Sequence, residues 1–140
     1  MTTWIIYALL SAFFAALVAI FGKIGLTGID TTFATTVRSV IMAAFLVLTS
    51  LALGKLDFQT SLGGKALTFI VLSGIAGALS WLFYFSALKN GPASGVAALD
   101  RLSVVFVLAL ALLFLGEHFT WKSSLGAFFI AVGAILMVIK

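Results

Sequence analysis

The chain has 140 residues, of which 64% are apolar and 9% are charged, and its formal net charge is +4. Soluble domains average about 45–50% apolar and about 25% charged residues, and a small soluble fold leaves much of its surface in water. The composition therefore excludes an ordinary soluble domain. It predicts an all-α polytopic membrane protein whose helices cross a bilayer.

The residue counts also exclude several kinds of site. The chain has no cysteine and one histidine, His118, so disulfides, thiolate metal sites and multi-histidine metal sites are excluded. One histidine and four acidic residues give little catalytic chemistry, and we expect no enzyme activity, cofactor or metal. The basic residues are scattered singly rather than clustered, so we expect no nucleic-acid partner.

Five apolar runs follow one another along the chain, covering about 4–21, 31–53, 66–88, 93–115 and 121–139. A helix needs about 17–25 residues to cross the hydrocarbon of a membrane, and the first run is short unless its helix continues past Lys23. Turn-forming residues separate the runs: Gly28, Asp30, Gly54, Gly63, Gly64, Gly91, Pro92 and Gly116. We therefore predict a single transmembrane domain of five helices over residues 1–140, in contact with membrane lipids.

The loop charges leave the orientation of these helices open. Each side of the membrane would carry three lysines: Lys55, Lys65 and Lys122 on one side, and Lys23, Lys89 and Lys140 on the other. Because orientation normally follows an excess of Lys and Arg in cytoplasmic loops, a balanced count gives no preference. One interpretation is a single orientation fixed by another influence. The other is dual topology, in which copies insert both ways and pair antiparallel.

Three charged residues lie inside predicted helices: Arg38, Asp100 and Arg101. A charge in hydrocarbon costs at least about 2.5–3.5 kcal/mol, so such residues usually line a substrate or proton path or form a buried pair. Arg38 follows Asp30 by eight residues and Asp100 follows Pro92 by eight, which predicts matching depths of about 10 Å. An Arg38–Asp100 pair is therefore plausible. Arg101 either extends to the headgroups or pairs with Asp100 itself, which would leave Arg38 for an anionic ligand.

Weaker candidates complete the predicted site. Trp81 and Tyr84 lie deep in the third run, where they either stack on a substrate or pack against helices and lipid. Asp100 is also a hypothesis for proton coupling. Lys23 is a secondary candidate, and Glu117, at the end of the fourth run, is expected to be hydrated.

The region from the third to the fifth helix carries a recognisable pattern. It consists of ALKNGPAS at 87–94, VAALDRLSVV at 96–105, LLFLGE at 112–117 and LGA at 125–127, with GKIG at 22–25 and TVRS at 36–39 nearer the N-terminus. Together these segments resemble the EamA domain of the drug/metabolite transporter superfamily. The DRLSVV stretch is similar to the half-length, five-helix bacterial branch of that family.

The resemblance implies transport of a small-molecule substrate across a bacterial plasma (inner) membrane. Full-length members contain two five-helix halves of inverted topology around a central cavity, and a lone half would rebuild that plan as an antiparallel homodimer working by alternating access. Ser103 joins the candidate site residues on this basis. Many members carry proline where Ala98 stands, and longer members often carry one near Ser103, so we expect a less kinked fourth helix here. Two alternatives remain: a lipid-linked substrate flippase and a non-transporting membrane assembly subunit.

Overall fold

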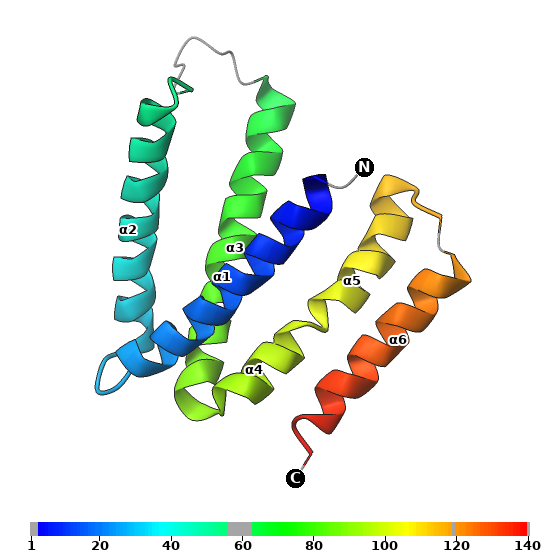
Figure 1. Cartoon of the computed structure of the whole chain (residues 1–140). Coiled ribbons are helices and arrows are strands. Elements are labelled where there is room, and N and C mark those ends of the chain that lie inside the picture. The colour runs from blue at the N-terminus through cyan, green and yellow to red at the C-terminus, as the bar shows by residue number, and fades with distance from the viewer. Residues whose placement is uncertain (1–2, 56–62, 119, 140) are drawn as a thin grey trace. The chain divides into compact units, whose positions relative to one another are not determined.

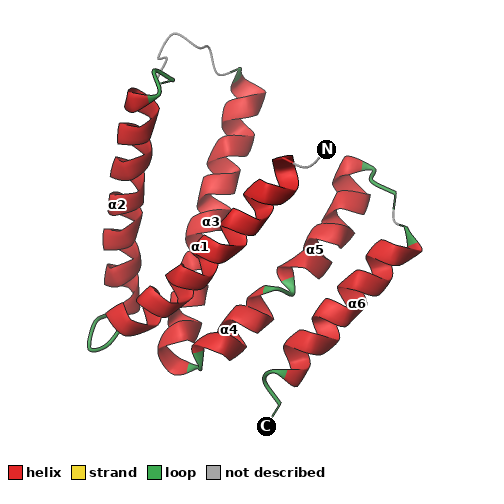
Figure 2. Cartoon of the chain, viewed as in Figure 1, coloured by secondary structure: helices red, strands yellow, loops and turns green. Residues whose placement is uncertain are grey.

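The computed structural model of the chain describes residues 3–55, 63–118 and 120–139, and every regular element in these ranges is helical. The elements are α1 (Thr3–Gly25), α2 (Thr31–Ala52), α3 (Gly64–Asn90), α4 (Ala93–Asp100), α5 (Ser103–Leu110), the π-helix η1 (Ala111–Leu115) and α6 (Trp121–Leu136), as Figures 1 and 2 show. Because α4, α5 and η1 together occupy the fourth apolar run, the predicted all-α fold of five helices is confirmed.

Four of the five runs are long and apolar enough to cross a membrane: 3–25, 31–52, 64–90 and 93–115. The first helix continues through Lys23 to Gly25, which gives it the length that the sequence left open. The third extends two residues beyond each predicted end. The fifth, α6, ends at Leu136 and has 16 residues, so it is a shorter apolar helix than predicted.

The chain divides into two compact units. A terminal unit contains Met1–Lys23 and Asn90–Lys140, and a central unit contains Ile24–Lys89. Lys140, which was counted in the loop-charge balance, lies outside the described residues. The prediction of one domain over 1–140 stays a prediction.

The central unit consists mainly of the antiparallel helices α2 and α3 (Figure 1). Asp30 caps the start of α2, where its side chain accepts a hydrogen bond of 2.9 Å from the backbone N–H of Phe33. At the end of α3, Lys89 Nζ donates a hydrogen bond of 2.9 Å to the carbonyl of Ile29. The loop end of this helix pair is therefore held by polar contacts that satisfy backbone groups.

In the terminal unit, α4 and α5 both pack against α6. The residues buried there are small, with Ala111, Ala127 and Ala134 all at most 9% exposed. Gly95 is also buried, and a Cβ at this position would lie 3.3 Å from Pro92 Cγ and 3.6 Å from Val138 Cγ2. Small residues at such contacts allow helix backbones to approach closely, as in other membrane helix pairs.

The fourth apolar run is interrupted between α4 and α5, at Arg101 and Leu102 (Figure 2). The N–H of Arg101 donates to the carbonyl of Ala98 at 3.1 Å, and that of Leu102 to the carbonyl of Leu99 at 2.9 Å. These bonds reach back three residues rather than four, as in a 3₁₀ turn, so the α-helical ladder is broken at this point. No proline stands at 98 or 103, so the interruption does not depend on the prolines that the resemblance led us to look for.

Candidate substrate site

Arg38 lies on the most buried face of the first half of α2. Thr31, Ala34 and Arg38 are partly buried and Thr35 is 4% exposed, and this i, i+3, i+4, i+7 spacing defines one helix face. Arg38 lies eight residues, or about 12 Å along the axis, from Asp30 at the start of α2. Trp81 lies nine residues, or about 13 Å, from Asn90 at the end of α3. The two side chains therefore meet at matching depths in an antiparallel pair.

The guanidinium of Arg38 stacks on aromatic rings of α3. Its Cζ lies 3.6 Å from the ring centroid of Trp81 and 5.3 Å from that of Phe85. A guanidinium within about 6 Å of a ring face is attracted by the ring quadrupole, most strongly by Trp, and the attraction grows when water is excluded. The stacking is therefore a local means of keeping a cation within a membrane helix.

Three aromatic side chains of α3 form the surface beneath Arg38. Trp81 lies 5.6 Å from Tyr84 and 5.7 Å from Phe85 between ring centroids, and Tyr84 lies 6.0 Å from Phe85. The structure thus brings together Arg38, Trp81 and Tyr84, which the sequence proposed separately. Sequence reasoning missed Phe85, which is 3% exposed. Its position four residues after Trp81 places both on one helix face and was the signal available.

The other polar side chains in the middle of α2 use their hydroxyl hydrogens within the helix. Thr35 donates to the carbonyl of Thr31 at 2.7 Å, Thr36 to that of Thr32 at 2.9 Å, and Ser39 to that of Thr35 at 2.8 Å. Arg38 makes no hydrogen bond or ion pair with the described residues of the central unit. Among these side chains of α2, only the N–H groups of Arg38 therefore lack an acceptor among the described residues of the central unit.

The other two intramembrane charges lie at the interruption of the fourth run. Asp100 is the last residue of α4, Arg101 begins the turn, and Ser103 is the first residue of α5. All three side chains are exposed. Asp100 and Arg38 belong to different units, so the Arg38–Asp100 pair, like the choice of arginine for it, stays a prediction.

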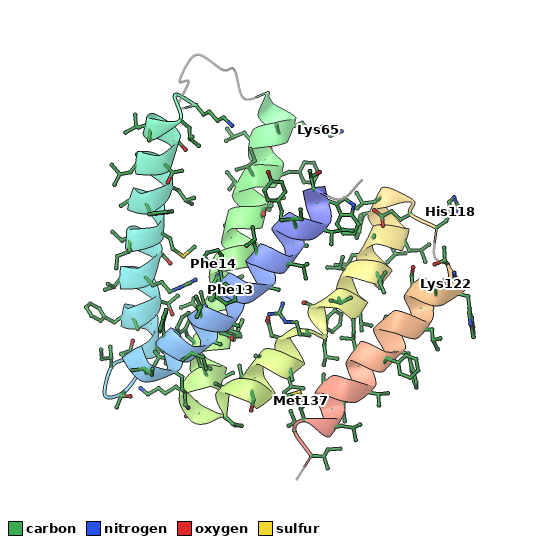
Figure 3. All side chains as sticks on the ribbon, viewed as in Figure 1. Phe13, Phe14, Lys65, His118, Lys122 and Met137 are labelled. Carbon is green, nitrogen blue, oxygen red and sulfur yellow. The ribbon has the colours of Figure 1, made fainter. Side chains whose placement is uncertain are left out.

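The secondary candidates Lys23 and Glu117 have different surroundings. Lys23 Nζ donates a hydrogen bond of 2.9 Å to the carbonyl of Gly91, which ties the end of α1 to the turn before α4. Glu117 follows η1 and is exposed, and its backbone N–H donates to the carbonyl of Ala111 at 3.3 Å. His118 lies in the connection to α6, and Lys122 lies in the first turn of α6 (Figure 3). The structural contact of Lys23 was not predicted from the sequence.

Comparison with known proteins identifies the family. The model of the EamA-like transporter family matches residues 2–139. The chain belongs to this family. A protein of Sinorhizobium sp. named Uncharacterized transporter in cobO 3'region is 43% identical over 137 residues, which cover 98% of this chain and 97% of that protein. An uncharacterised protein of Methanocaldococcus jannaschii is 33% identical over 76 residues, which cover 54% of this chain and 56% of that protein. No solved structure matches the chain.

The predicted resemblance to EamA proteins is thereby confirmed over nearly the whole chain. Family membership and the four long apolar spans make this chain a multi-pass membrane protein. The family and the transporter-named relative point to a transporter rather than an enzyme.

Proposed function

We propose that this EamA-family protein moves a small metabolite or drug-like solute across a bacterial plasma membrane as an antiparallel homodimer. The family match over residues 2–139 carries the proposal, together with the interruption of the fourth helix at Arg101 and Leu102, directly after Asp100. Transporters commonly place ionisable residues and broken helices at the substrate site, where two repeats of inverted topology meet. A single five-helix chain supplies one such repeat.

Exposure of the membrane spans supports a second copy. At most 11% of any of the four spans is buried within the chain. Lipid can cover apolar side chains, but the exposed charges of Asp100 and Arg101 would each cost at least about 2.5–3.5 kcal/mol against hydrocarbon. A partner copy around a water-filled path would give these two charges polar surroundings. The balanced lysines, three on each side, are compatible with insertion in both orientations.

Alternating access would follow from rocking of one copy against the other around the shared path. Asp100 is the candidate for proton coupling, because it is the carboxylate inside a predicted span. We expect Asp100→Asn to abolish the pH dependence of uptake. Retention of that dependence would exclude coupling at Asp100.

Topology is tested with two single-cysteine variants, because the natural chain has no cysteine. Thr27→Cys places a thiol in the connection before α2, and His118→Cys places one in the connection before α6, which the proposed topology puts on the opposite side of the membrane. A membrane-impermeant maleimide added to cells should label about half of each variant if both orientations occur. Full labelling of one variant and none of the other would contradict the antiparallel dimer.

Transport is tested with purified protein. A library of small solutes is screened by thermal shift for the natural chain and for Arg38→Ala, and solutes that stabilise the natural chain are then measured for uptake into proteoliposomes. Solute-dependent uptake supports transport. A strict monomer in detergent together with no stabilising solute would favour the alternative of a membrane assembly subunit, and lipid movement without solute uptake would favour a flippase.

A further inference from the structure

We propose that Arg38, stacked on Trp81 and Phe85, binds the carboxylate of an organic anion, so that the transported solute carries a carboxylate beside an apolar body. The claim that the bound anion is the transported solute rests on the proposed transport function. The binding site itself is defined within the central unit alone.

The geometry of stacking leaves the chemistry of the guanidinium available. Contact with Trp81 at 3.6 Å uses a face of the planar group, whereas its five N–H donors point outward in the plane. The fork of these donors matches a carboxylate, which accepts two parallel hydrogen bonds. The rings also hold the guanidinium in place, so a ligand meets a donor group that is already oriented.

The charges of the central unit favour an anion. Among its described residues the one acidic side chain is Asp30, whose carboxylate already accepts the N–H of Phe33 and lies about 12 Å along α2 from Arg38. The hydroxyls next to Arg38 donate to carbonyls of their own helix. A partly buried guanidinium within a membrane helix is costly when the described residues of its unit supply no counter-charge, and a ligand carboxylate would lower that cost.

The aromatic surface indicates what accompanies the carboxylate. Trp81 and Tyr84 are partly buried and belong to the same ring cluster as Phe85. Rings beside the guanidinium offer an apolar surface to the rest of a ligand, and an aromatic ligand would gain offset or edge contacts with them. An aromatic carboxylate is thus the simplest probe of the site.

Binding is measured by fluorescence with Trp81 as the reporter. Trp4→Phe and Trp121→Phe remove the other tryptophans, which are 68% and 81% exposed. In this background, purified in an uncharged detergent, benzoate should shift or quench Trp81 emission saturably, because it changes the field of the cation stacked on the indole. Benzamide has the same shape without the charge and should bind at least about tenfold more weakly.

Two variants test whether Arg38 is responsible. Arg38→Gln should abolish the benzoate response, and Arg38→Lys should weaken it about tenfold or more, because a lysine keeps the charge but loses the fork. Size-exclusion profiles of both variants show whether they are folded. A benzoate response that survives unchanged in a folded Arg38→Gln protein would overturn the proposal.

Three control ligands, namely benzamide, benzyltrimethylammonium and phosphatidylglycerol, distinguish a solute carboxylate from competing ligands. An equal response to benzamide would mean apolar binding, and a response to benzyltrimethylammonium instead of benzoate would mean that the rings form a cation site. A response to added phosphatidylglycerol without one to benzoate would assign Arg38 to a lipid headgroup. Each of these results contradicts the proposal. Because the assay measures binding in detergent, a benzoate site without solute uptake would overturn the transport proposal and leave this site standing.

Discussion

The terminal and central units bury different kinds of residue. The most buried apolar residues of the terminal unit are all alanines, namely Ala19, Ala111, Ala127 and Ala134, whereas those of the central unit are Leu26, Phe85 and Leu88. In the terminal unit, α4 packs against α6, and Gly95 of α4 lies close to Val138, which follows the end of α6. In the central unit, large side chains and a stacked arginine connect α2 and α3. Backbone proximity and side-chain bulk are thus two ways of packing apolar helices within one short chain.

The two units also differ in how far their intramembrane charges are exposed. Arg38 is covered by aromatic rings of its own unit, but Asp100 and Arg101 are exposed at the interruption of the fourth run. A covered charge can contribute to the stability of a single chain. An exposed charge within a membrane span needs polar surroundings, such as water or a partner charge, because hydrocarbon does not solvate it.

The largest expected effect on stability is loss of the ring beneath Arg38. Truncation of a fully buried aromatic side chain costs about 3–5 kcal/mol, and Trp81 is only partly buried, so Trp81→Ala should cost about 2–3 kcal/mol. Part of this cost is the attraction between Trp81 and Arg38, worth about 1–2 kcal/mol. The double variant Trp81→Ala/Arg38→Met should therefore lose less than the sum of the single changes. Thermal or denaturant unfolding in detergent measures all three variants.

Trp121→Ala is the matched control for that prediction. Trp121 is 81% exposed at the start of α6, and its removal should change the free energy of unfolding by no more than about 0.5 kcal/mol. Strict additivity of Trp81→Ala and Arg38→Met would show that the stacking does not stabilise the central unit.

A smaller effect is expected from enlarging Gly95 in the terminal unit. A leucine there must displace Pro92 or Val138, and such overpacking costs about 1–3 kcal/mol. Gly126→Leu in α6 is the control, because nothing lies within 4 Å of a Cβ at that position. In detergent, Gly95→Leu should lower the unfolding temperature and Gly126→Leu should not. Equal effects would contradict close packing around Gly95.

The smallest effects concern the two lysine contacts. Lys23→Met and Lys89→Met each remove a donor to a loop carbonyl, that of Gly91 in the terminal unit and that of Ile29 in the central unit. A typical hydrogen bond contributes about 0.5–1.5 kcal/mol, and the partly buried Lys23 contact should fall higher in this range than the exposed Lys89 contact. Lys122→Met, at an exposed position, should be neutral in the same unfolding assay. A larger loss from Lys89→Met than from Lys23→Met would reverse this ranking.

Much of the fold could be predicted because its signals are local. Hydropathy located the five runs, and turn residues such as Gly54 and Gly116, which both adopt positive φ, located the breaks between them. The interruption at Arg101 and Leu102 was not predicted. No proline or glycine marks it, and it consists of backbone hydrogen bonds that reach back three residues instead of four.

The candidate site was predicted in part. Arg38, Trp81 and Tyr84 were proposed because a charge and polar aromatics inside apolar runs are unusual, and the structure places them side by side. Phe85 was missed because phenylalanine is common in this chain, which has 14 of them, and so carries no signal alone. The paired contacts of Lys23 and Lys89 were missed because each joins residues 60 or more positions apart.

By itself, the sequence determined that the chain crosses a membrane, where its apolar spans begin and end to within a few residues, and which charges lie within those spans. These properties depend on apolar content and turn residues within short stretches of chain. Tertiary structure alone decided that Arg38 stacks on Trp81, that α4 and α5 pack against α6, and that Lys23 and Lys89 donate to loop carbonyls. Such contacts join residues far apart along the chain, and they form only when helices of matching depth are packed together.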